Sequence, residues 1–150
     1  DQAKRLLNDE RLILAFPEGA RGTAKLAKDA DSLVEFGTGF MRLALETGSP
    51  IIPFGFVGGG EALPTIANLK RLGRMFGVPY IPVTKWGLLV PKPTRFQLLY
   101  GKPMVFEGTG HERDEVVSAK VEQVKERIHI LIRQGRALRD KVISEDELVL

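Results

Sequence analysis

Hydrophobic and polar positions at the start of the chain predict a helix followed by a strand. Residues 2–8 have the spacing of a short helix. The apolar run 11–16 (RLILAF) comes next and stops at Pro17, which is typical of a buried strand. We therefore expect a helix that leads directly into a strand of the core.

An amphipathic helix and a second apolar run follow. Hydrophobic side chains recur at helical spacing over residues 36–47, and Gly48 with Pro50 predicts that the helix ends there. The run 51–57 (IIPFGFV) has the pattern of another buried strand, in which Pro53 fits only at a sheet edge or a bulge. A strand, a helix and a strand in this order predict a crossover unit.

The second half of the chain is predicted to contain two more helices and one strand. Spaced hydrophobic residues over 63–76 indicate a helix, whereas the span 79–93, rich in proline and aromatic residues, indicates irregular structure. Residues 95–100 have the pattern of a strand with one solvated side. Residues 113–134 predict a long amphipathic helix that can continue past Gly135, and a charged tail follows.

Helices that alternate with short hydrophobic strands predict an α/β fold, with a mostly parallel or mixed sheet flanked by helices. The chain has no internal repeat, low-complexity tract or linker that would divide it. We therefore expect one domain.

Composition narrows the classes of function. The chain has 150 residues, of which 43% are hydrophobic and 27% charged, as in an ordinary globular domain. No apolar stretch reaches the ~20 residues of a membrane helix. The absence of cysteine excludes thiolate chemistry, and two separated histidines do not make a usual zinc site, so we expect no bound metal. A net charge of +3 is only a weak bias towards phosphates or anionic lipids.

The segment 16–22 (FPEGARG) places a carboxylate, a guanidinium and two glycines directly after a predicted strand. Ligands bind beyond the strand ends of open α/β sheets. Pro17 stiffens the turn, Gly19 permits a positive φ or the close approach of a ligand, and Arg21 offers a planar fork suited to phosphate. The alternative is a glycine turn with a local ion pair between Glu18 and Arg21.

Two nucleotide-binding motifs come close to matching and fail. Residues 19–26 have Ala24 in place of the second glycine of a P-loop and Leu26 in place of its Ser or Thr. The glycines at 58–60 follow a predicted strand, but Leu63 stands where a dinucleotide-binding fold needs a small residue. The chain also has no Gly-x-Ser-x-Gly elbow. These observations disfavour nucleotide binding and serine-hydrolase chemistry.

The segment 16–21 (FPEGAR) resembles the third conserved block of the lysophospholipid acyltransferase family, the 1-acylglycerol-3-phosphate acyltransferase-like enzymes. That block is commonly Phe-Pro-Glu-Gly-Thr-Arg, so Ala20 is the one departure. The segment 49–54 (SPIIPF) is similar to the fourth block, an apolar strand that ends in proline, and it stands at the expected distance. The resemblance covers roughly residues 5–100, and the last helix carries no motif.

The resemblance implies an enzyme that transfers a fatty acyl group from acyl-CoA or acyl carrier protein to a lysophospholipid or glycerol-phosphate-type hydroxyl, with no other cofactor. In that family a His-x-x-x-x-Asp block removes the proton of the acceptor hydroxyl. Here His111 is followed five positions later by Val116, and His129 by Gln134, so neither matches. We therefore expect residues 1–150 to be the C-terminal portion of a single, incomplete glycerol-phosphate-acyltransferase-like domain that lacks its catalytic block.

By the same resemblance, Glu18, Gly19 and Arg21 help to hold the glycerol phosphate of the acceptor, and Pro53 shapes the donor or acceptor pocket. For Pro53 the alternative is a strand-end proline without ligand contact. Lys25 is a further candidate for the phosphate, although an exposed lysine in a polar loop is usually only solvated.

The resemblance also implies the partners: an acyl donor thioester, a glycerolipid acceptor and the cytoplasmic face of a membrane, contacted peripherally, with no nucleic acid. The predicted helix over 63–76 combines basic and apolar residues and precedes Tyr80 and Trp86, a composition that suits a membrane surface. The same pattern arises when a helix packs its apolar face inward.

Two other functions are compatible with these patterns. The first is a non-catalytic module that binds lipid or anions on the same scaffold, which the absence of a His-x-x-x-x-Asp block upstream would favour. The second is a partner-binding module that uses the last helix as its interface. In that case phosphate-containing ligands would not perturb the surroundings of Arg21.

Overall fold

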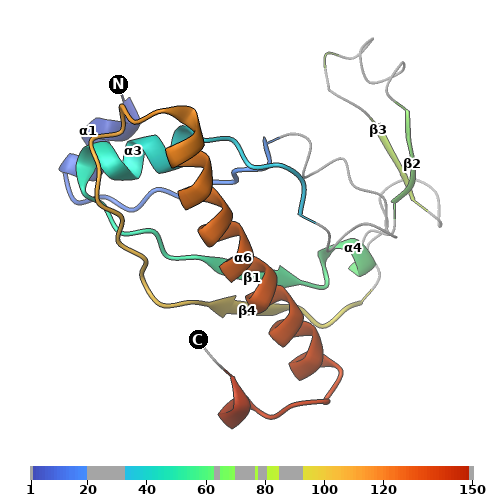
Figure 1. Ribbon diagram of the computed structural model, residues 1–150. Coiled ribbons are helices and arrows are strands. Elements are labelled where there is room, and N and C mark those ends of the chain that lie inside the picture. Colours follow the sequence, from blue (N-terminus) through green and yellow to red (C-terminus); the bar gives the residue numbers. More distant parts are fainter. Residues whose placement is uncertain are drawn as a thin grey trace.

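The computed structural model describes residues 2–19, 33–62, 65–69, 77, 81–84 and 93–148. Helices and strands are both present in these ranges, so the fold is mixed α/β, as predicted (Figure 1). The elements in chain order are α1 (Gln2–Asn8), α3 (Gly39–Thr47), β1 (Phe54–Val57), α4 (Gly59–Ala62), β2 (Thr65–Leu69), β3 (Ile81–Thr84), β4 (Gln97–Tyr100), α6 (Asp114–Arg139) and the 3-10 helix η2 (Glu145–Glu147).

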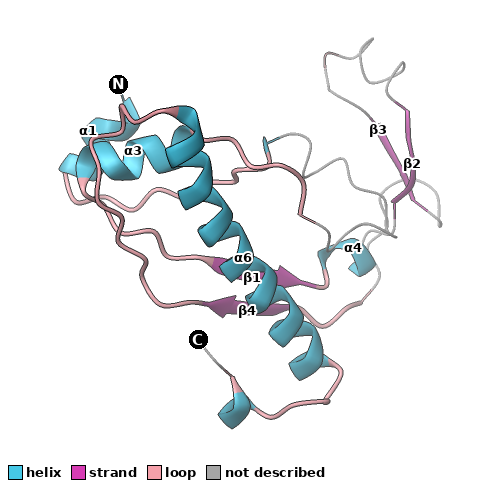
Figure 2. Ribbon diagram, viewed as in Figure 1, coloured by secondary structure: helices cyan, strands magenta, loops and turns pink. Residues whose placement is uncertain are grey.

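The described strands form two separate antiparallel pairs, β1 with β4 and β2 with β3 (Figure 2). In the first pair Phe54 lies opposite Tyr100 and Val57 opposite Gln97. The expectation of a mostly parallel or mixed sheet is therefore not met by these strands. Hydrophobic pattern specifies that a strand is buried but not which neighbour supplies its hydrogen bonds, and for that reason the prediction failed.

Helix α6 crosses one face of the β1–β4 pair (Figure 1). Gly55 and Val57 of β1 and Leu99 of β4 are buried on this face. The opposite face carries apolar side chains that are half-buried or exposed: Phe54, Phe56, Leu98 and Tyr100. This alternation follows from the pleat of a strand, which sends successive side chains to opposite faces. Residues 95–100 were predicted to have one solvated side, and β4 confirms it.

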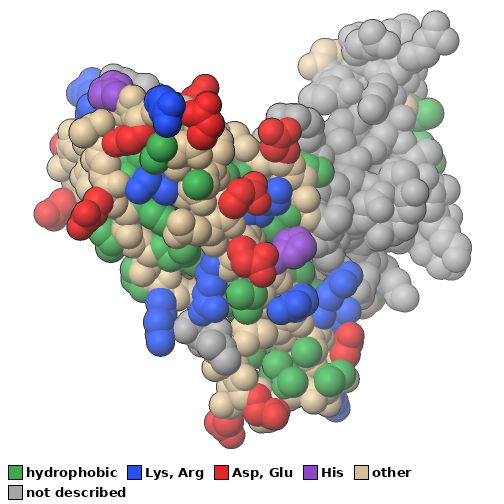
Figure 3. Space-filling model, viewed as in Figure 1, with side chains coloured by type: hydrophobic (Ala, Val, Ile, Leu, Met, Phe, Trp, Pro, Cys, Tyr) green, Lys and Arg blue, Asp and Glu red, His purple; other side chains and the backbone are tan. Residues whose placement is uncertain are grey.

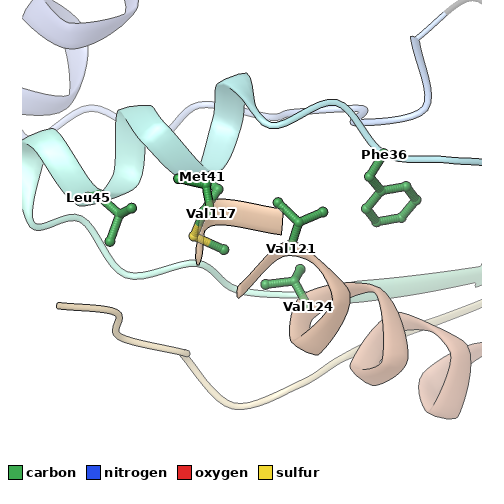
Figure 4. Close-up of a cluster of buried hydrophobic side chains, with 6 residues drawn as sticks. All are labelled: Phe36, Met41, Leu45, Val117, Val121 and Val124. Atoms are coloured by element: carbon green, nitrogen blue, oxygen red, sulfur yellow. The ribbon is translucent and has the colours of Figure 1, made fainter. Parts of the chain in front are cut away.

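The hydrophobic core lies where α3 packs against the first half of α6 (Figure 4). Met41 and Val117 are completely buried, and Leu45, Val121 and Val124 are nearly so. Phe36, which precedes α3, belongs to the same cluster. Helix α3 thus contributes side chains one helical turn apart to a single core. The buried pair in this core is Met41 and Leu45, whereas Phe40, Leu43 and Thr47, which suggested the helical repeat, are only half-buried.

Helix α3 ends where its sequence predicts, whereas α6 extends to Arg139, beyond the end predicted near residue 134. Gly48 follows α3 with a left-handed φ of 64°, and its N–H bonds to the carbonyl of Ala44, so the helix ends at Thr47. Helix α6 has acidic residues in its first turn and basic residues in its last turn. These charges interact favourably with the helix dipole and stabilise the helix. It continues past Gly135, because this glycine lies against the side chains of Leu99 and Val57.

Pro53 lies outside the strand ladder, at an irregularity between the Ile51–Met104 bridge and β1, and the extra residue of this irregularity is on the opposite segment. Ile51 pairs with Met104 and Phe54 with Tyr100, so residues 52–53 lie opposite the three residues 101–103. The carbonyl of Pro53 accepts a hydrogen bond of 2.8 Å from the N–H of Gly101. The strand therefore tolerates a residue that cannot donate.

The run 11–16, predicted as a buried strand, is not a strand in the structure. Leu12, Leu14 and Phe16 are 90%, 64% and 69% exposed. A strand needs a backbone partner, and within the described residues no ladder forms along this run. The prediction of a strand–helix–strand crossover unit, which requires this strand, is therefore also wrong for the described residues.

Two further predictions are wrong between β1 and β4. Residues 65–69 form strand β2 rather than a helix, and residues 81–84, predicted to be irregular, form strand β3. Thr65 and Ile66 are β-branched and Asn68 has low helix propensity, so local preference opposes a helix despite the spacing of the hydrophobic residues. The other residues of the helix predicted over 63–76, which are 63–64 and 70–76, lie outside the described residues.

Candidate functional site

The predicted acceptor motif begins with a tight turn at residues 16–19. The N–H of Gly19 donates a hydrogen bond of 3.0 Å to the carbonyl of Phe16. Gly19 has a φ of +57°, a conformation that residues with a side chain rarely adopt. No heavy atom of the described residues lies within 4 Å of the position that a β-carbon on Gly19 would take. The positive φ predicted for this glycine is present, and the close approach of a ligand stays a prediction.

Glu18 follows Pro17 in this turn and is half-buried. Its Oε1 accepts a hydrogen bond of 2.7 Å from the main-chain N–H of Val34. The carbonyl of Pro17 accepts a second bond, of 3.0 Å, from the N–H of Gly37. Two bonds thus join the turn to residues 34–37. Arg21, Ala20 and Lys25 lie outside the described residues.

The two sequence blocks that suggested the function lie side by side. The ring of Phe16, at the start of the first block, meets the ring of Phe54 edge to face, with 6.4 Å between the ring centroids. Phe54 ends the second block and begins β1. Phe54 in turn contacts Tyr100 of β4 at 6.1 Å. The turn at 16–19 is therefore positioned beside the start of β1.

Pro53 is packed inside the fold and is not exposed at an open site. Its side chain is fully buried. A β-carbon on Gly101 would lie 3.0 Å from Cγ of Pro53 and 3.3 Å from Cδ1 of Leu131, so the proline fills the space between β4 and α6. The role of Pro53 in shaping a neighbouring pocket stays a prediction.

The two histidines lie on the surface. His111 is exposed in the loop before α6, and His129 is exposed on α6 itself. In the part of the chain that the structure describes, no three His, Asp or Glu side chains come together to hold a metal ion. The basic residues at 70, 71 and 74, with Tyr80 and Trp86, lie outside that part.

A second polar cluster joins α3 to the start of α6. The guanidinium of Arg42 donates to the carbonyl of Gly110 at 2.6 Å, to that of Glu112 at 3.1 Å and to Oδ1 of Asp114 at 2.6 Å. Hydrogen bonds from the main-chain N–H and hydroxyl of Thr109 hold the pKa of the Glu112 carboxyl below its ordinary value of 4.5. The cluster closes the loop at 107–113 over α3.

On the face of the molecule that Figure 3 shows, charge does not single out a binding area. In Figure 3 the basic and acidic side chains over α6 lie among one another rather than in separate areas. Such a mixed surface produces little long-range attraction for an anionic partner. The candidate site is therefore defined by its local geometry at 16–19.

Val34 and Gly37 both bond to the motif, although no sequence pattern marked them. Their contribution comes from main-chain N–H groups, which every residue except proline carries. No residue type or spacing marks such a donor. Only the folded arrangement places residues 34–37 beside the turn.

Comparison with known proteins supports the resemblance. Residues 1–57 match the family described as Acyltransferase. The uncharacterized protein Rv0502 of Mycobacterium tuberculosis is 35% identical over 136 residues, which include 84% of this chain and 38% of the relative. The uncharacterized protein ML2427 of Mycobacterium leprae is 36% identical over 136 residues, with 84% of this chain and 37% of the relative covered. The chain thus spans less than two fifths of the length of the curated relatives that it matches.

No solved structure matches the chain significantly. Among the described residues, no helix has the length and apolar character that crossing a membrane requires. The matched segment 1–57 contains both sequence blocks, and the structure places these blocks in contact through Phe16 and Phe54. Residues 1–57 of this chain are therefore similar to the acyltransferase family.

Proposed function

We propose that this chain is part of an acyltransferase that moves a fatty acyl group from acyl-CoA or acyl carrier protein to a hydroxyl of a lysophospholipid or glycerol-phosphate-type acceptor. The match of residues 1–57 to the acyltransferase family carries this proposal. The matched segment contains Glu18, Gly19, Arg21 and Pro53, which form the acceptor site in the proposal.

The open turn at Gly19 supports an acceptor site beside Phe16 and Glu18. A phosphate ester can approach the chain closely where no β-carbon intervenes. Arg21 follows two residues later and supplies a bidentate partner for phosphate oxygens. Pro53 contributes indirectly, since its buried ring sets the start of β1 beside this turn.

In the proposed reaction, a base removes the proton of the acceptor hydroxyl, the oxygen attacks the thioester carbonyl, and the thiol leaves. The two histidines of this chain lack the aspartate that such a His-x-x-x-x-Asp block places five positions later. The base therefore comes from another part of the protein, and this chain supplies acceptor binding. The proposed place of work is the cytoplasmic face of a membrane, reached by peripheral contact.

Acyl transfer tests the proposal directly. We expect the 150-residue chain to be inactive with acyl-CoA and 1-acylglycerol 3-phosphate, and a longer protein that includes a His-x-x-x-x-Asp block to be active. In that protein Arg21→Lys should raise the half-saturation concentration of the acceptor by roughly tenfold to a hundredfold, because the bidentate contact is lost. Equal activity of the chain and the longer protein would contradict the assignment of the base. Binding of the acceptor without acyl transfer would instead favour a non-catalytic lipid- or anion-binding module.

A further inference from the structure

The face of the β1–β4 pair opposite α6 consists of apolar side chains from both strands. Phe54 lies across from Tyr100, and Phe56 lies across from Leu98. Phe56, Leu98 and Tyr100 are 47%, 48% and 58% exposed. Among the described elements, α6 is the one helix with extensive contacts to both strands, and it packs on the other face (Figure 1). One face of the pair is therefore core, whereas the other exposes residues of the same apolar kind.

Aromatic contacts make this surface continuous. The ring of Phe96, two residues before Leu98 on the same side of the chain, stacks on Phe56 with 5.5 Å between centroids and 16° between planes. Phe16 extends the surface at the other end, because its ring meets Phe54 and is 69% exposed. We call this surface the open face, and its members are Phe16, Phe54, Phe56, Phe96, Leu98 and Tyr100.

The size of the open face argues against a second copy of this chain as its cover. Phe56, Phe96, Leu98 and Tyr100 are each about half exposed, which leaves roughly 100 Å² of each in solvent, or about 400 Å² together. A contiguous apolar patch of this size is typical of an interaction surface. Two separate folded proteins need about 800 Å² on each partner for a stable complex. A segment of the same polypeptide needs less area, because the covalent link gives it a high effective concentration.

Charge near the open face does not favour a lipid surface. Strands β1 and β4 contain no Lys or Arg, and the basic residues nearest to them in sequence are Arg95 and Lys102. Segments that bind anionic lipid by charge carry clusters of about four to eight basic residues. Two flanking residues do not make such a cluster.

The related proteins are long enough to supply a cover from their own chain. The matched region takes up 38% of Rv0502 and 37% of ML2427, so more than three fifths of each relative lies outside it. We propose that the open face is an internal interface of a longer protein, covered by an apolar surface of the polypeptide outside residues 1–150. The inference uses the exposure of these side chains and the length of the relatives, and it does not depend on acyl transfer. It places the covering segment beside the turn at 16–19, because Phe16 belongs to both.

Thiol labelling of the longer protein tests this interface. Residues 1–150 contain no cysteine, so a variant in which all other cysteines are replaced carries one introduced thiol. We compare Leu98→Cys on the open face with Glu126→Cys on the exposed side of α6. A maleimide should react at least about a hundredfold more slowly at position 98, because reaction there requires local opening of the interface. Rates within about threefold of each other would overturn the proposal.

The same assay distinguishes the other two covers. Slow labelling of Leu98→Cys should be independent of protein concentration and of added vesicles of equimolar phosphatidylcholine and phosphatidylglycerol. Protection that appears only with vesicles would assign the open face to a membrane, and protection that grows with protein concentration would assign it to a second copy. Either result would overturn the internal interface.

A second variant decides the matter if Leu98→Cys does not fold. Tyr100→Trp keeps a large aromatic side chain on the open face, and Glu126→Trp is its matched control on α6. Both are made with Trp86 and every other tryptophan replaced by phenylalanine. Iodide should quench the fluorescence at position 100 at least about threefold less than at position 126, because a covered indole is shielded from solvent. Equal quenching at the two positions would contradict the proposal.

Discussion

A β-carbon placed on Gly55 would lie 2.9 Å from the backbone carbonyl carbon of Leu131, so β1 and α6 touch main chain to main chain. Backbone atoms cannot move aside as side-chain tips do. We therefore expect Gly55→Ala to lower the free energy of unfolding by about 1–3 kcal/mol, the usual cost of overpacking. Urea unfolding followed by circular dichroism measures the change.

Gly135→Ala is the matched control for Gly55→Ala. Its β-carbon would lie 3.1 Å from side-chain atoms of Leu99 and Val57, which can shift by a small amount. Alanine also gains up to about 1 kcal/mol of helix propensity over glycine inside α6. We expect a smaller loss than for Gly55→Ala. Equal losses would show that helix and strand do not touch through their backbones at Gly55.

Arg42 should stabilise the molecule mainly through carbonyl groups rather than through its ion pair. It donates to the carbonyls of Gly110 and Glu112, and Gly110 is buried. Arg42→Ala should therefore cost about 1–3 kcal/mol, because a buried carbonyl loses its donor. Asp114→Asn should cost no more than about 1 kcal/mol, since the Asp114 side chain is 87% exposed. Thermal and urea unfolding compare the two variants. A larger loss for Asp114→Asn would assign the stabilisation to the ion pair.

Stability should fall in acid partly through Glu112. Its pKa in the folded chain lies below the ordinary value of 4.5 because Thr109 donates hydrogen bonds to the carboxylate. A lowered pKa means that the group stabilises the fold above about pH 4.5 and loses this contribution as the pH falls through the folded value. Glu112→Gln should therefore flatten the decline in unfolding free energy below about pH 4.5. Glu126→Gln, which removes one charge from the exposed surface of α6, is the control, and equal curves for the two variants would exclude this role for Glu112.

The end of α3 and the position of Pro53 could be predicted from the sequence because single residues determine them. Gly48 ended α3 where expected, and Pro53 lies outside the strand ladder beside β1, where its missing N–H costs no ladder bond. The amphipathic pattern over residues 113–134 likewise predicted α6, whose buried side contains Val117, Val121 and Val124. In each case the controlling physics is local, either an allowed φ or a helical repeat.

Strand pairing and the contacts of the motif could not be predicted in this way. The run 11–16 is apolar enough for a strand, yet a strand also needs a neighbour, which hydrophobicity does not specify. Thr65 and Ile66 showed the opposite error, since the helical spacing around them concealed a β preference. The hydrogen bond from Val34 to Glu18 could not be predicted for a related reason. Its donor is a main-chain N–H, which does not depend on the residue type.

Substitutions of Pro53 and of Arg21 should have different effects when the longer protein is assayed for acyl transfer. Because the Pro53 ring is fully buried, Pro53→Ala should lower the unfolding free energy by about 1–2 kcal/mol through lost packing. The half-saturation concentration of the acceptor should then change by less than about threefold, whereas Arg21→Lys should raise it without loss of stability. Initial rates over a range of acceptor concentrations, with urea unfolding of each variant, measure both effects. A stable Pro53→Ala variant with a strongly raised half-saturation concentration would show that Pro53 contacts the acceptor.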